Sequence, residues 1–288
     1  MIEELRLQYA IPVLCDLLEV SRSGYHRWKE NPSSRRHQEE GRLEVEILAA
    51  HKRTRETYSA ERLQTDLAVH GVCVGVHRIR RIRKKLGLRC KQKKKFKATT
   101  DSRHNLPVAE NLLDQKFEVT RPNQVWVSDI TYVATGEGWL YLAAHKDLYN
   151  GAIVGHAMGP RITKGLVLQS LFRAVASRRP EKGLIYHSDR GSQYCSRRYG
   201  KVLELFGIRA SMSRKGNCYD NAPMESFWGT LKNEMVHHRR YATRAEAMVG
   251  EIREYIEMFY NRQRCQKRLD NLSPAAFEKR YYGQQRAA

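Results

Sequence analysis

The chain has 288 residues, of which 41% are hydrophobic, enough to build a folded core and to exclude wholesale disorder. Its 52 Lys and Arg residues outnumber 31 Asp and Glu residues, which gives a formal net charge of +21. A charge excess of this size indicates a polyanionic partner, either nucleic acid or an anionic membrane. No apolar run reaches about 18 residues and the N-terminus does not resemble a signal peptide, so we expect nucleic acid and no membrane.

The six cysteines form no C-x-x-C pair and accompany no paired histidine spacing. This pattern favours neither a zinc site nor a disulfide framework. We therefore expect reduced thiols in a cytoplasmic, nucleoid-associated protein.

Residues 1–32 are predicted to form an N-terminal helical segment with two short helices. Ser21 is a candidate cap for the second helix, which the Asn31-Pro32 pair would end. The polar stretch from Pro32 to Gly41 is predicted to be a linker.

Residues 42–98 are predicted to be a DNA-binding region of three short helices, similar to a helix-turn-helix unit. Twelve Arg or Lys residues and no acid lie between Arg78 and Lys97. Such a run indicates contact with DNA phosphates, although a solvated helix followed by a charged linker would read the same way. The candidate DNA-binding residues in it are Arg78, Arg81, Lys84, Lys85, Lys93, Lys94 and Lys95.

In residues 118–285 the spacing of apolar residues differs from the helical spacing of the preceding region. Short β-rich segments come first and then alternate with helices. This order predicts a mixed α/β sheet with helices on both faces, which is compatible with the ribonuclease-H-like fold. The expected strands cover residues 126–133, 139–147, 152–158, 183–189 and 208–213, and the expected helices cover residues 163–178, 199–206, 222–235 and 243–260.

Three acids stand out by their positions, either because an unpaired carboxylate is costly to bury there or because the position would let it meet the other acids. Asp129 is inside an apolar strand, Asp189 ends another, and Glu225 is early in a packed helix. Clustered carboxylates repel one another and are stabilised by cations, and hard oxygen ligands suit Mg²⁺ or Mn²⁺. Two such ions would support in-line phosphoryl displacement. Asp147 is an alternative for the first position and Asp220 for the third.

Four sequence blocks resemble those of bacterial insertion-sequence transposases of the OrfB type, whose core is similar to that of retroviral integrases. The blocks are WVSDITYV, YHSDRGSQYCS, GNCYDNAPMESFWGTLKNE and YNRQRCQKRLDNLSPAAFE. The resemblance implies a ribonuclease-H-like core with a catalytic and metal-binding triad of Asp129, Asp189 and Glu225. The 35 residues between Asp189 and Glu225 agree with the family's spacing.

The same resemblance implies Mg²⁺-dependent cleavage at the ends of a mobile element, with Mn²⁺ as a substitute and two ions expected. The freed 3′-hydroxyl then joins to target double-stranded DNA. Lys232 matches a basic position near the DNA end, although a solvated surface lysine is equally compatible. A homo-multimer and an upstream helix-turn-helix partner protein are expected from the family. A non-catalytic DNA-binding regulator and a nuclease of the same fold are the alternative functions.

Overall fold

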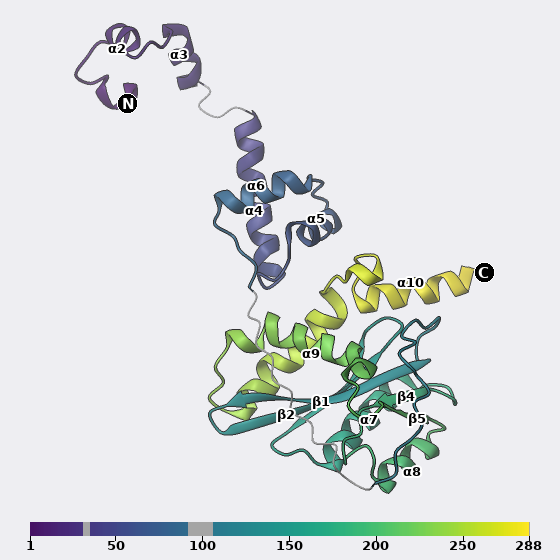
Figure 1. Cartoon of the computed structure of the whole chain (residues 1–288). Helices are drawn as coiled ribbons and strands as arrows, with labels where there is room; N and C mark the ends of the chain where they lie inside the picture. Colours follow the sequence, from purple (N-terminus) through teal and green to yellow (C-terminus); the bar gives the residue numbers. More distant parts are fainter. Residues whose placement is uncertain (31–34, 92–105, 288) are drawn as a thin grey trace. The chain divides into compact units, whose positions relative to one another are not determined.

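The computed structural model describes residues 1–30, 35–91 and 106–287, which belong to two compact units, Met1–Arg89 and Cys90–Ala288 (Figure 1). Within the described residues, no helix is both long and apolar enough to cross a membrane. Among the described residues, Cys15, Cys73, Cys90, Cys195 and Cys265 form no disulfide bond.

Residues 1–30 form three short helices where the sequence predicted two: α1 (Ile2–Leu5), α2 (Ile11–Leu17) and α3 (Arg22–Glu30). The predicted cap is present, because the Ser21 hydroxyl accepts a hydrogen bond from the Gly24 N–H (3.0 Å). The buried Tyr25 donates its hydroxyl to Glu3 (2.7 Å), which ties α3 to α1.

The second part of this unit is the predicted set of three helices: α4 (Arg35–Arg53), α5 (Ala60–Val69) and α6 (Val76–Lys85). Ser59 caps α5 by accepting from the Arg62 N–H (3.5 Å). The core of these helices is aliphatic and fully buried, and its main members are Ile47, Leu63, Leu67, Ile79 and Ile82.

The linker predicted over residues 32–41 is wrong from Arg35 onward, because α4 already begins there. This first turn and a half contains no apolar residue, so hydrophobic periodicity gave no helix signal. Its helical structure is instead accompanied by ion pairs from Glu39 to Arg78 and from Glu40 to Arg81, both on α6.

The second unit contains a sheet of five strands in the order β3-β2-β1-β4-β5. Strands β1 and β2, and β2 and β3, pair antiparallel, whereas β4 lies parallel to β1 and β5 parallel to β4. This is the predicted ribonuclease-H-like arrangement. The strands are β1 (Val125–Thr135), β2 (Gly138–Asp147), β3 (Ile153–Gly159), β4 (Ile185–Ser188) and β5 (Arg209–Met212).

Helices cover both faces of this sheet (Figure 1). Helices α7 (Lys164–Arg178) and α8 (Arg197–Leu205) contribute to the main apolar core together with strand residues such as Trp126. Helix α9 (Ala222–Glu234) contacts β1 and is drawn on the opposite side of the sheet from α7. Gly155 of β3 permits close packing on α7, since a Cβ at this position would lie 2.6 Å from the Ser170 carbonyl oxygen.

The C-terminal part differs from the prediction in two ways. The helix expected over residues 243–260 is π-helical in two stretches, and a further helix, α10, was not predicted. Thr243, just before the helical turn that leads into the first stretch, accepts a hydrogen bond from the Glu246 N–H (3.1 Å). The Glu246 carboxylate returns to the Ala242 N–H (2.7 Å), one residue earlier than in a standard capping box. The elements around and after α9 are η1 (Cys218–Asn221), η2 (Val236–His238), η3 (Glu246–Ile252), η4 (Tyr255–Gln263), η5 (Lys267–Leu269) and α10 (Pro274–Ala287).

Candidate active site

Asp129 and Asp189 occupy matching places on neighbouring parallel strands. Ser128 of β1 pairs with Ser188 of β4, and each serine is followed directly by one of the two aspartates. Side chains that alternate along two in-register parallel strands share a face, and the strands lie about 4.8 Å apart. The register therefore places the two carboxylates side by side where β4 ends.

Three hydrogen bonds fix the start of α9 over this point of the sheet. Asn221 donates its amide to the carbonyl oxygen of Ser128 (3.1 Å), and Trp228 donates its indole N–H to Asp129 Oδ2 (2.9 Å). The buried Lys146 of β2 donates to the carbonyl oxygen of Pro223 (2.9 Å), in the first turn of α9. That turn also carries Glu225, which lies three residues before Trp228 and so on the same helix face.

The Asp129 carboxyl has a pKa raised to about 7. Burial is the main cause, and the negative charges of Asp189 and then Glu225 add to it, while hydrogen bonds from the Ile130 N–H (2.7 Å) and Trp228 oppose it. Glu225 is exposed at the rim of the site, and the partial loss of water around its carboxyl raises its pKa. The three predicted acids thus act on one electrostatic environment, in which a cation would favour the ionised form of Asp129.

The rival acid Asp147 serves the backbone around it. Its buried carboxylate accepts from the N–H groups of Asn123 (2.8 Å) and Tyr149 (2.9 Å), and burial raises its pKa to about 6. Its β1 partner is Trp126, three residues before Asp129. Asp147 is therefore a structural acceptor at the Trp126 end of the β1–β2 ladder.

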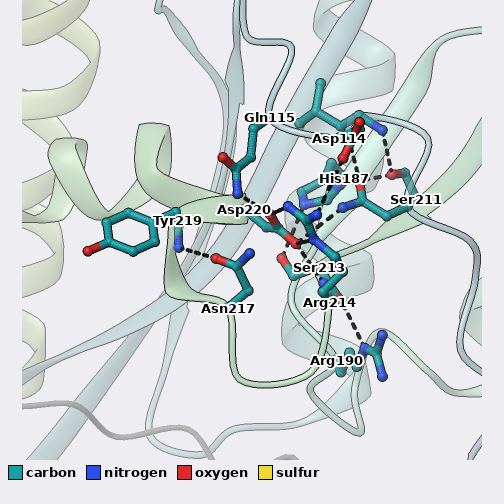
Figure 2. A network of polar contacts seen from close by, with 12 residues as sticks. Asp114, Gln115, His187, Arg190, Ser211, Ser213, Arg214, Asn217, Tyr219 and Asp220 are labelled. Carbon is teal, nitrogen blue, oxygen red and sulfur yellow. Dashed lines mark hydrogen bonds and ion pairs between the residues drawn. The ribbon is translucent and has the colours of Figure 1, made fainter.

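The other alternative acid, Asp220, accepts many hydrogen bonds from neighbouring side chains and backbone (Figure 2). Arg214 donates three hydrogen bonds to it, from its backbone N–H (2.7 Å) and its guanidinium (3.1 and 2.8 Å). Gln115 (2.8 Å) and Asn111 (3.1 Å) donate two more. The Arg214 side chain is the main reason that the pKa of this buried carboxyl lies far below its usual range. A carboxylate saturated in this way has little capacity left for a metal ion.

The chemistry of the three predicted acids fits a hard divalent cation, because all their donor atoms are carboxylate oxygens. A further oxygen is at hand: Asn221 Oδ1 is buried and has no hydrogen-bond partner within the described part of the chain. In the conformation described for residues 1–30, 35–91 and 106–287, no three His, Cys, Asp or Glu side chains approach closely enough to enclose an ion. The residues therefore fit the metal by type and charge.

Comparison with known proteins places this geometry in a family. Integrase core domain models match residues 119–218 and 225–281, and an HTH-like domain model matches residues 37–96. A 31 kDa protein of insertion element IS600 from Shigella sonnei is 61% identical over 269 residues, covering 93% of this chain and 98% of that protein. The transposase InsF of insertion sequence IS3A from Escherichia coli K12 is 40% identical over 279 residues, covering 96% of each.

The chain belongs to the insertion-sequence transposases with an integrase core. Among solved structures, the catalytic core domain of BIV integrase is 15% identical with a TM-score of 0.44, and the alignment covers 57% of this chain and 98% of that one.

In this transposase the predicted basic residue Lys232 lies on α9, seven residues after Glu225. Its ammonium group is 5.0 Å from the centre of the Tyr132 ring. Partial burial lowers the pKa of Lys232, and the charge of Asp129 opposes this effect. Lys232 is thus a half-buried neighbour of the acids rather than a solvated surface lysine, while its contact with DNA stays a prediction.

The remaining predicted DNA contacts divide between α6 and a segment beyond the described residues. Arg78, Arg81 and Lys85 of α6 form ion pairs with Glu39, Glu40 and Glu44 of α4 at 3.1, 2.9 and 2.5 Å. Lys84 is exposed on the same helix. Lys93, Lys94 and Lys95 lie outside the described residues.

Two residues outside the predicted set contribute to the site, Trp228 and Lys146. Trp228 is buried and also donates to Asp129. Lys146 looked like the polar end of a strand, and only its place inside an otherwise apolar stretch hinted at burial. His187 has a structural place, because it is buried between the Ser211 (2.8 Å) and Ser213 (3.1 Å) hydroxyls (Figure 2).

Proposed function

We propose that this chain is the catalytic subunit of a DNA transposase, with Asp129, Asp189 and Glu225 as catalytic and metal-binding residues. The observation that carries the proposal is the parallel pairing of Ser128 with Ser188, which sets Asp129 beside Asp189 under the first turn of α9. A triad drawn from two strands and one fixed helix needs no flexible loop to bring its members together.

The reaction is phosphodiester cleavage followed by strand transfer. Water attacks phosphorus at the end of the element, the P–O3′ bond breaks, and a 3′-hydroxyl is released. That hydroxyl attacks a target phosphodiester and forms a new P–O bond, and a target 3′-hydroxyl leaves. Two Mg²⁺ ions, or Mn²⁺ in their place, would activate the attacking oxygen and stabilise the leaving one when bound.

The chain's own residues orient the proposed metal-binding carboxylates. Trp228 and the Ile130 N–H hold the two Asp129 oxygens in place, so that this carboxylate keeps one orientation. Lys146 and Asn221 hold the first turn of α9, and with it Glu225, against the sheet. Lys232 supplies positive charge along the same helix, where a DNA phosphate would complement it.

The DNA partner is double-stranded, consisting of the element's ends and a target. The exposed cations of α6 would bind it largely through phosphates. A homo-multimer that pairs two ends, an upstream helix-turn-helix partner protein and action on the bacterial nucleoid in the cytoplasm complete the proposal.

A strand-transfer assay tests it. Purified chain is mixed with Mg²⁺ or Mn²⁺ and a labelled duplex that ends in the flanking terminal repeat, alongside Asp189→Ala and the exposed-acid control Asp16→Ala. We expect joined products from the unmodified chain and the control, and none from Asp189→Ala. Cleavage without joining would indicate a nuclease. DNA binding without any cleavage, even with the upstream helix-turn-helix module fused on, would indicate a non-catalytic regulator.

A further inference from the structure

A cleft of about 520 Å³ opens between the N-terminal part of α4 and helix α6. Its lining is strongly basic: three arginines and a histidine surround a single acid. These residues are Arg36, Glu39, His77, Arg78 and Arg81. A cavity with this lining attracts an anion that accepts several hydrogen bonds at once.

The acids beside the cleft neutralise only part of its charge. Arg78 pairs with Glu39 (3.1 Å) and Arg81 with Glu40 (2.9 Å), whereas Arg36 has no ion pair within the described residues. Each pair has one exposed member, Glu39 at 58% and Arg81 at 54%, and one half-buried member, Arg78 at 32% and Glu40 at 23%. Ion pairs with an exposed member are weakened by solvent, so a better acceptor can replace the carboxylate.

Packing does not explain why these side chains gather here. The first residues of α4, from Arg35 to Gly41, include no apolar side chain that could anchor the helix. Arg36 is exposed, so solvation alone gives its guanidinium no reason to lie at the cleft rather than in open solvent. An arginine with no ion pair in the described part of the chain, beside two whose ion pairs are partly exposed, is the arrangement expected of a phosphate site.

We propose that this cleft binds one phosphate of the DNA backbone, with Arg36, Arg78 and Arg81 as donors and Glu39 as the acid that the phosphate displaces. The proposal rests on the proposed function, because it assumes that the chain handles DNA. It deepens that function by naming where α4 takes part in binding. A planar guanidinium group can donate two parallel hydrogen bonds to two oxygens of one phosphate, and several arginines can share that phosphate.

A phosphate contact carries no sequence information, so its loss weakens binding equally on all duplexes. Forming a phosphate contact also releases counterions from the DNA. Each such contact therefore makes the affinity for DNA fall more steeply as the salt concentration rises. These two signatures distinguish the cleft from a base-reading role of α6.

The test measures binding of the full-length chain to a labelled terminal-repeat duplex and a scrambled duplex by fluorescence anisotropy across a NaCl series. Arg36→Ala should reduce the slope of log affinity against log salt by about 1 on both duplexes. Arg36→Lys, which keeps the charge, should keep most of the slope. Glu39→Gln should bind about two- to fivefold more tightly at low salt, because the competing carboxylate is gone.

Two control variants in the second unit remove the same charges as Arg36→Ala and Glu39→Gln. Arg121 and Glu181 form a comparable exposed pair (2.8 Å), so Arg121→Ala and Glu181→Gln should leave slope and affinity unchanged. An Arg36→Ala slope equal to that of the unmodified chain would overturn the cleft while leaving DNA binding intact. So would a loss confined to the terminal-repeat duplex. An unmodified chain that binds neither duplex would overturn the proposed function together with the cleft.

Discussion

Trp228 combines core packing with a hydrogen bond to one of the proposed metal-binding acids. It is buried against Phe227, with ring centres 4.8 Å apart, and at the same time its indole N–H donates to Asp129 Oδ2 (2.9 Å). Residues that orient a metal-binding carboxylate in this way tune the site without touching the substrate. Trp228 is therefore a positioning residue in the proposed reaction.

Trp228→Phe should keep the buried ring but lose the donor. We expect strand transfer to slow by about tenfold, because Asp129 loses one of its two fixed oxygens. DNA affinity, measured by anisotropy, should not change. Trp139→Phe, at a half-exposed tryptophan of β2, is the control and should react at the unmodified rate. Equal rates for both variants would show that the hydrogen bond has no role.

Asn221 fixes the entry of α9 through a buried hydrogen bond to the Ser128 carbonyl oxygen (3.1 Å). Asn221→Ala leaves that oxygen without its donor, so we expect a loss of about 1 kcal/mol and a melting temperature about 2–4 °C lower. Asn217→Ala removes a hydrogen bond in the loop before η1, to the exposed Tyr219, and should cost less than half as much. A larger effect at Asn217 would contradict the assignment.

At the scale of elements, β4 and β5 are coupled by His187, which lies buried between two serine hydroxyls on β5 and just beyond it. Burial lowers its pKa to about 4, and the charge of Asp220 opposes this. The unfolded chain takes up the proton near pH 6.5, whereas the folded chain resists it until about pH 4. The neutral histidine therefore favours the folded state above pH 6.5, and this contribution is lost as the pH falls toward 4.

His187→Asn removes the titrating group and retains a hydrogen-bonding side chain. Between pH 6.5 and 4 the unmodified chain should lose up to about 1.4 kcal/mol more stability per pH unit than the variant. Urea unfolding at several pH values measures the difference. Parallel stability curves for the two proteins would contradict the buried, neutral state of His187.

The elements themselves were largely predictable. The spacing of apolar residues indicates strands β1 to β5 and helices α5 to α9, and capping residues such as Ser59 and Thr163 mark where helices begin. The Thr163 hydroxyl accepts from the Leu166 N–H (3.1 Å). The start of α4 was not, because ion pairs to α6 rather than apolar residues accompany it. Helix α10 was also missed, although its Phe277 packs on Tyr149 with ring centres 5.3 Å apart.

At the scale of the whole molecule, the limit of sequence reasoning is long-range pairing. An acid inside an apolar strand marked Asp129 as unusual, but nothing local reveals that Ser128 pairs with Ser188, 60 residues later. The same limit kept Asp147 and Asp220 open as alternatives. Their hydrogen bonds to Asn123 and Arg214 come from other segments, and these bonds show that both acids serve the fold.

The net charge of +21 extends over both units and motivates DNA as the partner, but charge alone does not distinguish binding from catalysis. The distinction lies in the three acids. A metal ligand can be recognised by changing its softness, because a thiolate binds Mn²⁺ or a softer ion in preference to Mg²⁺.

Strand transfer by Asp189→Cys, compared with Mg²⁺ and with Mn²⁺, is therefore the most direct test that these carboxylates hold the catalytic metal. The unmodified chain should join DNA with either ion. The variant should give no joined product with Mg²⁺ and should recover joining with Mn²⁺. Undiminished joining by the variant with Mg²⁺ would show that Asp189 is not a metal ligand and would contradict the account.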